Sequence, residues 1–402
     1  MELKHSDQFT RSVRANIAFW SRHTGLADPS AWPALHRDRE NLFRATIFGL
    51  QLPDTYLEAA ELAARCFEYV FERGYWADWI PVLEQAITDC PDDELALRGR
   101  LNGQLGSLYR KDRRLDEAVA AYNQQENIAR QLNDPYGLAS AHLRLGQVYN
   151  RKRQYEATER YAQMAMDEFE AINAPPEKIA DTLNLLGLVA LGRGDWHKAE
   201  TNLRRACDLF RRANKHVDVG RSLANLLLAL EHTGRIDEAF EMSEEAGQIF
   251  TAYDLHLERA RLYINLGTLH YRRGDLAKAE AAFRQADTSA MRRSGPVYLQ
   301  SLTEMNLGNV LLSQGRIEES RPYLLKCVAG FRRVNAQIML ANSLEGLAET
   351  SIELGDRDEA IHLCEEALAI VAAIPEDAFA NRLEKRVRTI LDELTLSADD
   401  QN

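Results

Sequence analysis

The stretch 263-YINLGTLHYRRGDLAKAEAAF-283 decides the fold, because it contains two apolar patterns of helical period separated by a turn signal. Gly274 stands where the first helix should end, since glycine tolerates the left-handed backbone conformation that such an ending needs. The small residues Gly267 and Ala279 would let two helices approach closely. The stretch therefore predicts a pair of antiparallel helices and contains no evident catalytic group.

The same pattern recurs in seven copies with a period of about 40 residues. The first small-residue position is held by Gly106, Gly146, Gly187, Leu227, Gly267, Gly308 and Ala348, at spacings of 40, 41, 40, 40, 41 and 40. A second position, seven residues later, is usually Gly, and a third, five residues further, is usually Ala. Leu227 is bulky for the first position, and Thr158 stands at the third position, where Ala is usual. Both exceptions predict local differences in the angle at which the helices cross. Self-similarity at this period predicts a stack of helix pairs.

These N-L-G…G-D/R-x-x-x-A frames resemble the tetratricopeptide repeat (TPR) family over about residues 98–375. The resemblance implies an all-α fold, a right-handed TPR superhelix (α-solenoid) of about eight antiparallel helix pairs. Its period exceeds the usual 34 residues. In this it is similar to the TPR arrays of STAND-type (NB-ARC-like) bacterial regulatory ATPases, peptide-pheromone receptors and kinesin light chains.

Four segments are expected. Residues 1–55 would form an N-terminal helical adaptor and residues 56–97 a degenerate TPR-like helix pair, in which Phe67 and Trp79 replace the small residues and Gly74 separates the helices. Residues 98–375 hold the seven repeats. Residues 376–402 would form a capping helix, Ala378 to Leu394, and a disordered tail.

The adaptor contains a second resemblance. Six of its residues match a motif that opens the TPR sensor of STAND-type ATPases: Trp32, Leu35, Glu40, Asn41, Leu42 and Ala45. An ordinary amphipathic helix at the start of the stack explains the same residues equally well. Under the first interpretation an ATPase or effector domain would act in cis or in trans.

Composition and the absence of short motifs argue against several classes of function. The formal net charge of −12 argues against direct binding of nucleic acid or an anionic membrane. The five cysteines are odd in number and form no CxxC motif, which favours reduced, packed thiols in a cytoplasmic protein. No apolar run reaches the length of a membrane span. No Lys follows a Gly, and the GxSxG, HExxH and GxGxxG motifs do not occur. We therefore expect neither an enzyme nor a cofactor or metal site.

The resemblance implies that the first helix of each pair lines a concave groove. The groove candidates for peptide binding are Arg100, Arg110, Lys111, Arg144, Asn150, Arg151, Arg221, Asn225, Arg261, Asn265, Tyr271, Arg272, Asn306 and Asn309. Asn225, Asn265 and Asn306 occupy the same repeat position. Such an amide ladder can pair with both the N–H and the C=O of an extended peptide. The alternative is that these amides stabilise the helix pairs or face water.

Charge should vary along the groove. The early repeats carry arginines, whereas the last carries Glu345, Glu349 and Glu353, which favours an acidic or phosphorylated partner segment at the basic end. The predicted function is a protein- or peptide-binding scaffold or regulatory sensor. Two alternatives remain open: the ligand-sensing C-terminal module of a STAND-type ATPase or transcriptional regulator, and a regulator like the peptide-pheromone receptors. Assembly into a homo-oligomer is compatible with each.

Overall fold

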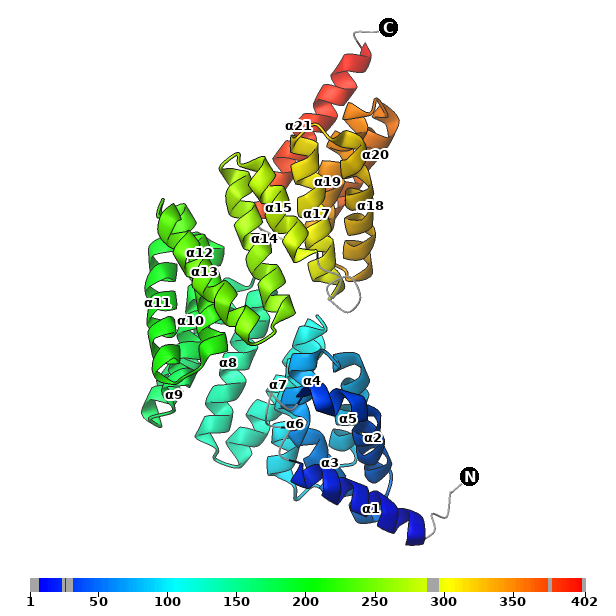
Figure 1. Ribbon diagram of the computed structural model, residues 1–402, viewed down its shortest axis with the longest axis vertical. Coiled ribbons are helices and arrows are strands. Elements are labelled where there is room, and N and C mark those ends of the chain that lie inside the picture. Colours follow the sequence, from blue (N-terminus) through cyan, green and yellow to red (C-terminus); the bar gives the residue numbers. More distant parts are fainter. Residues whose placement is uncertain (1–6, 24–25, 27–31, 288–295, 375–377, 400–402) are drawn as a thin grey trace. The chain divides into compact units, whose positions relative to one another are not determined.

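The computed structural model describes residues 7–23, 26, 32–287, 296–374 and 378–399. Every regular element within these ranges is a helix, which confirms the predicted all-α class (Figure 1). The chain forms two compact units, Met1–Leu209 and Phe210–Asn402. Each unit is a stack of antiparallel helix pairs, as expected for an α-solenoid.

Unit 1 starts with α1 (Asp7–Arg22), α2 (Trp32–Leu50) and a short 3-10 turn, η3 (Pro53–Thr55). The degenerate pair follows; its first helix is interrupted at Cys66 into α3 (Tyr56–Arg65) and α4 (Phe67–Arg73), and its second is α5 (Trp76–Thr88). The next three pairs are α6 (Leu95–Lys111) with α7 (Leu115–Gln131), α8 (Pro135–Arg151) with α9 (Tyr155–Ala171), and α10 (Pro176–Arg193) with α11 (Trp196–Arg212), whose last residues belong to unit 2.

Unit 2 contains the remaining four pairs and a final helix. The pairs are α12 (His216–His232) with α13 (Ile236–Ala252), α14 (His256–Arg272) with α15 (Leu276–Ala286), α17 (Val297–Ser313) with α18 (Ile317–Arg333), and α19 (Gln337–Glu353) with α20 (Arg357–Ala372). The last helix, α21, runs from Ala378 to Asp399. It therefore continues past the predicted end at Leu394 into the segment expected to be disordered, of which residues 400–402 lie outside the described part.

The predicted turn inside each pair is confirmed. The second-position glycines of five copies have positive φ angles, among them Gly194 at 78° and Gly274 at 80°. In the first two copies the same position is held by Arg113 (φ 65°) and Arg153 (φ 60°), which adopt the left-handed conformation without being glycine. Gly74 of the degenerate pair behaves likewise, with φ 81°. One backbone geometry thus separates the helices of every pair.

The turn between consecutive pairs uses a different residue type, which the sequence pattern did not identify. Left-handed Asn or Asp residues recur there at the repeat period, with φ between 50° and 55°: Asn133, Asn173, Asn214, Asp254 and Asn335. Asn and Asp tolerate this conformation better than other non-glycine residues, because their short polar side chains bond locally.

Close approach of the two helices explains why small residues recur at the first and third repeat positions. A Cβ atom at Gly187 would lie 2.7 Å from Leu203 Cγ, and one at Gly308 would lie 2.6 Å from Leu324 Cγ. The alanines at the third position are fully buried. Thr158 fits the same site because its hydroxyl donates to the Gln154 carbonyl oxygen at 2.9 Å, so no polar group is left unpaired.

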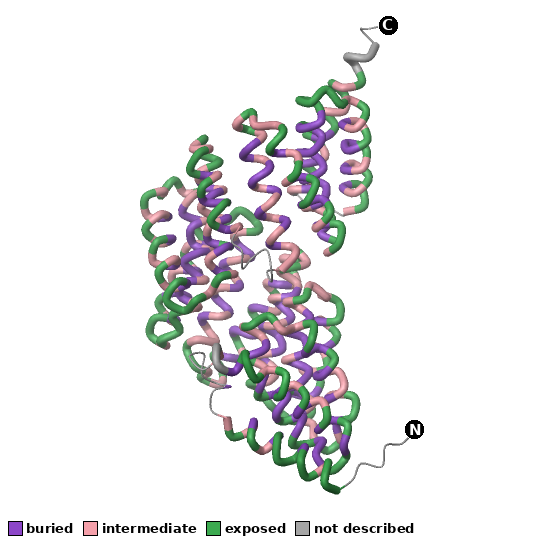
Figure 2. Tube along the Cα trace, turned by 45° about the vertical axis from the view of Figure 1, so that its right-hand side comes forward, coloured by how far each residue is buried: buried purple, intermediate pink, exposed green. Residues whose placement is uncertain are grey.

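The first helices of successive pairs touch one another. In unit 1 the order is α3, α6, α8 and α10, and in unit 2 it is α12, α14, α17, α19 and α21. We call each series a first-helix row. Buried residues run along the inner faces of these helices, whereas the turns are exposed (Figure 2). Among the described residues, no helix is both long and apolar enough to cross a bilayer. All five cysteines are buried and carry free thiols.

Candidate functional site

Two candidate arginines of unit 1 bond the preceding first helix. Arg100 of α6 pairs with the carboxylate of Glu61 in α3. Arg144 of α8 donates to the Gly103 carbonyl oxygen at 2.6 Å and to Ser107 Oγ at 3.0 Å, both in α6. The partners lie 39 and 41 residues apart along the chain, which is one repeat period. We call such contacts inter-repeat bonds.

Inter-repeat bonds recur in unit 2. Arg221 of α12 donates to Asp218 at 3.2 Å and to Glu258 of α14 at 2.9 Å. Arg272 of α14 donates to Glu231 of α12 at 3.1 Å, and the Glu231 side chain is only 8% exposed. These arginines therefore stabilise the first-helix row, and their positive charge is already balanced by a carboxylate.

The asparagines of the predicted ladder divide into two kinds. Asn265 Nδ2 donates to the Ala224 carbonyl oxygen at 3.3 Å, so this amide also joins two repeats. Asn225, half-buried on α12, has an interaction partner as well. Within the described ranges, the amides of Asn306 and Asn309 on α17 have no protein partner, which leaves their hydrogen-bonding groups available. A ladder that reads a peptide backbone remains a prediction.

Lys111 makes a local contact at the end of α6. Its Nζ lies 4.4 Å from the centroid of the Phe71 ring and 5.7 Å from that of Trp76. A cation over an aromatic face is held electrostatically. Four further groove candidates lie on first helices and have half-buried or exposed side chains: Arg110, Asn150, Arg151 and Arg261.

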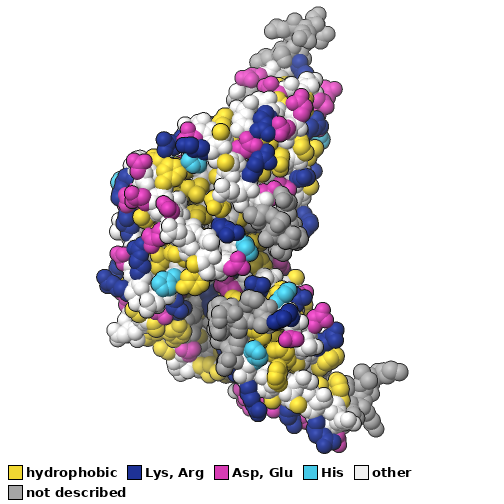
Figure 3. Space-filling model, viewed as in Figure 1, with side chains coloured by type: hydrophobic (Ala, Val, Ile, Leu, Met, Phe, Trp, Pro, Cys, Tyr) yellow, Lys and Arg dark blue, Asp and Glu magenta, His cyan; other side chains and the backbone are white. Residues whose placement is uncertain are grey.

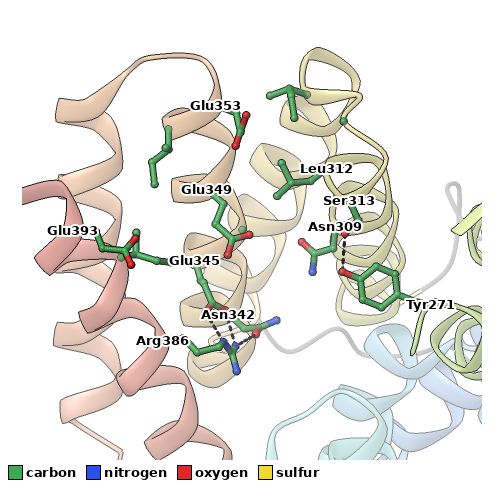
Figure 4. A pocket seen from close by; sticks show the side chains of 15 residues that line it. Tyr271, Asn309, Leu312, Ser313, Asn342, Glu345, Glu349, Glu353, Arg386 and Glu393 are labelled. Atoms are coloured by element: carbon green, nitrogen blue, oxygen red, sulfur yellow. Dashed lines mark hydrogen bonds and ion pairs between the residues drawn. The ribbon is translucent and has the colours of Figure 1, made fainter. Parts of the chain in front are cut away.

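Unit 2 contains an open pocket of about 860 Å³ where α17, α19 and α21 meet, with Tyr271 of α14 at its edge (Figure 4). It brings together two candidates, Tyr271 and Asn309. The Tyr271 hydroxyl lies 2.8 Å from Ser313 Oγ. The amides that line the pocket are those of Asn309 and Asn342, and its carboxylates are Glu345, Glu349, Glu353 and Glu393.

Among the described residues that line the pocket, Arg386 of α21 is the one cation, and it is paired. Its guanidinium donates to both carboxylate oxygens of Glu345 at 2.6 Å. The Glu345 side chain is 9% exposed, so this bidentate pair is largely shielded from water. Arg386 and Glu345 lie 41 residues apart. Alignment of α21 with the other first helices would have identified Arg386 as a residue that bonds the preceding repeat. We expected this segment to form only a capping helix.

The electrostatics of the pocket disfavour further negative charge. The pKa of Glu349 is raised, because neighbouring protein atoms displace part of the water around its carboxylate and because Glu345 adds a like charge. Arg386 opposes this effect only in part. Glu349 nonetheless remains accessible from the pocket opening.

Solved structures with the same fold are similar over most of the chain. A Rap protein complexed with Competence and Sporulation Factor has a TM-score of 0.63 and 14% identity, covering 96% of this chain and 99% of that protein. Aspartyl phosphate phosphatase F from Bacillus subtilis has a TM-score of 0.54 and 15% identity, covering 93% and 97%. A STAND protein with a tetratricopeptide repeat sensor from Pyrococcus horikoshii has a TM-score of 0.53 and 15% identity, covering 87% and 54%.

Sequence comparison gives a complementary result. No curated protein sequence matches the chain significantly. Family models described as "Tetratricopeptide repeat" match residues 178–252, 228–286 and 299–373, and residues 101–136. Together these matches cover more than half of the chain. The chain therefore belongs to the tetratricopeptide repeat family.

Proposed function

We propose that this protein is a regulatory TPR protein that binds an extended segment of another polypeptide along the first-helix row of unit 2. The observation that carries the proposal is the pocket of unit 2, in which side chains of consecutive first helices converge on one open space. Its volume lies in the range of specific ligand sites, which is about 300–1,000 Å³. Binding in this surface requires no catalytic group.

Proteins of the same fold support the assignment. One Rap structure is a complex with Competence and Sporulation Factor, and a Rap conjugation gene regulator of the plasmid pLS20 is a complex with the Phr* peptide. We infer that the present chain also takes a peptide. Among the groove candidates, Tyr271, Asn306 and Asn309 are the best placed to contact it, because the arginines that form inter-repeat bonds are already committed to the fold.

Peptide selection tests this proposal. A library of random peptides is selected on the immobilised full chain, and enriched sequences are measured by fluorescence polarisation. Asn306→Ala with Asn309→Ala removes two unpartnered amides of the row. Gln248→Ala with Gln285→Ala, at exposed positions of α13 and α15, is the matched control.

We expect enriched peptides to bind the wild type and the control alike and the asparagine variant on the order of tenfold more weakly, which corresponds to about 1.4 kcal/mol. Failure to enrich any sequence would overturn the proposal. Equal binding to both variants would show that the peptides bind elsewhere.

A sensor module of a STAND-type ATPase is the second candidate. It is favoured by the adaptor residues of α2 that match the STAND motif and by the fold of the Pyrococcus protein, of which this chain spans about half. The complete coding region and its neighbouring frames test it. A P-loop ATPase encoded there supports the candidate, and its absence from both removes it.

A further inference from the structure

The pocket of unit 2 has a pronounced charge asymmetry. Glu345, Glu349 and Glu353 follow one another at four-residue intervals along α19, and Glu393 projects from α21 on the facing side (Figure 4). Arg386 neutralises Glu345. In the described part of the chain, no basic side chain pairs with the other three carboxylates. The space between α19 and α21 is therefore strongly acidic.

Apolar side chains complete the pocket. Leu312 and Ile317 are among its lining residues, as are Ile352 of α19 and Ile390 of α21, the two helices that carry the carboxylates. A Lys or Arg side chain matches this combination, because its aliphatic stem packs on apolar surface while its charged head stays with a carboxylate. Asn309 adds an unpartnered amide, which can bond a peptide group.

The protein itself shows how a guanidinium is held here. Arg386 reaches across from α21 and binds Glu345 of α19 through two parallel hydrogen bonds. Glu349 lies one helical turn further along α19, and its pKa is raised, first by partial desolvation and then by the like charge of Glu345. A second cation at Glu349 would relieve that repulsion.

A metal ion is a poorer occupant. The carboxylates are spaced along two helices, and within the described residues no group of three or more His, Cys, Asp or Glu side chains converges as metal ligands would. The elongated arrangement fits an extended organic cation.

We propose that this pocket binds an extended peptide segment through a Lys or Arg side chain, with the cationic head between Glu349 and Glu353 and the stem on Ile352 and Ile390. This inference rests on the proposed peptide-binding function and assigns its specificity. It differs from the sequence-based expectation of an acidic partner, which concerned the arginines of the early repeats. Of those arginines, Arg100 pairs with Glu61, and Arg144 donates to neutral acceptors of α6. Glu349 and Glu353 have no basic partner among the described residues.

Defined peptide pools test the inference on the full chain. Three labelled pools of short peptides share neutral, randomised flanks and differ only at a central Arg, norleucine or Glu. Binding is measured at low and at high salt. Glu349→Gln with Glu353→Gln removes the two carboxylates, and Glu244→Gln with Glu365→Gln, exposed on α13 and α20, makes the same change in net charge elsewhere.

The Arg pool should bind the wild type on the order of tenfold more tightly than the norleucine pool, and the Glu pool most weakly, because charge complementarity discriminates between partners. This advantage should vanish in Glu349→Gln with Glu353→Gln, persist in the control, and shrink at high salt. Circular dichroism melting verifies that both variants fold.

Other outcomes separate the two proposals. Equal binding of the Arg and norleucine pools, with peptides from the random library still lost in the asparagine variant, would overturn the cation specificity and leave the peptide function standing. An Arg advantage that survives in Glu349→Gln with Glu353→Gln would place the cation elsewhere and also overturn it. Spermidine binding that depends on these glutamates, without any Arg-pool advantage, would identify a free polyamine as the ligand instead.

Discussion

Gly274 is constrained by its backbone and not by its surroundings. Its φ angle is 80°, and no atom lies within 4 Å of the position that a Cβ would occupy. Gly267, seven residues earlier, is the opposite case, because a Cβ there would collide with the ring of Phe283. The two glycines of one repeat thus serve different purposes, one in ending a helix and one in allowing close packing.

Gly274→Ala isolates the backbone effect. The left-handed conformation costs a non-glycine residue roughly 1–2 kcal/mol, and the stiffer unfolded chain returns part of this. We expect a net loss of about 1 kcal/mol in the free energy of unfolding, measured by urea titration. Arg273→Ala, at an ordinary φ of −81° in the same turn, is the control and should change stability by less than about 0.5 kcal/mol. Equal effects of the two substitutions would contradict the backbone argument.

At the scale of the helix, polar side chains hold neighbouring repeats together through hydrogen bonds and ion pairs. Glu159 of α9 accepts hydrogen bonds from Lys198 of α11 at 2.8 Å and from Arg193 of α10 at 2.6 Å. These contacts lower the pKa of Glu159, the hydrogen bond from Lys198 having the largest effect. One carboxylate thereby connects three helices.

Glu159 should make stability depend on pH. Its pKa is lower in the folded than in the unfolded chain, so the unfolded state binds more protons and stability falls on acidification. The contribution is complete above the ordinary carboxyl pKa and is lost as the pH falls through the lowered value. Because the site is partly exposed, we expect less than about 1 kcal/mol.

Urea midpoints of wild type and Glu159→Gln, measured over a pH series, should differ near neutral pH and converge in acid. Glu170→Gln, exposed on the same helix, should parallel the wild type throughout. A constant gap between wild type and Glu159→Gln at every pH would show that the loss is not electrostatic.

The inter-repeat bond between Arg272 of α14 and Glu231 of α12 should contribute to stability in the absence of any ligand. Arg272→Ala leaves the nearly buried carboxylate of Glu231 without its cation. We expect a loss of about 1–3 kcal/mol, since an unpaired buried polar group bears its full desolvation penalty. Adding Glu231→Gln should recover part of the loss. Strict additivity of the two changes in a double-mutant cycle would show that the residues do not interact.

The sequence predicts the helix pairs better than it predicts the groove, for a physical reason. The repeat positions that Gly187 and Ala199 hold serve the close packing of two helices. Their recurrence at a fixed spacing therefore identifies them from the sequence alone. The side chain of Arg272 is long enough to contact either a ligand or the preceding repeat. Its rotamer determines which of the two it contacts, and the sequence does not show the rotamer. Arg386 was missed because the final helix lacks the second helix of a pair, although it continues the first-helix row.

At the scale of the whole molecule, the surface carries interspersed charges of both signs on the face shown in Figure 3, despite the net charge of −12. A field of one sign does not extend over this face. Under the proposed function, selectivity for a partner would come from local features such as the pocket of unit 2. Stability should be local as well, because each helix pair of a solenoid packs mainly on its neighbours.

Leu383→Ala tests whether stability is local. Leu383 of α21 is fully buried in a core with Val371 and Leu344 of the last pair, so its truncation should cost about 2–5 kcal/mol there. Hydrogen exchange should accelerate in α19, α20 and α21, while the amides of α6 to α9 keep their protection. Leu145→Ala, in the core of unit 1, is the matched control and should reverse this distribution. Uniform acceleration of exchange throughout the chain in both variants would mean that the repeats unfold as one cooperative block. Only in that case does a substitution in one unit change the exchange rates of amides in the other.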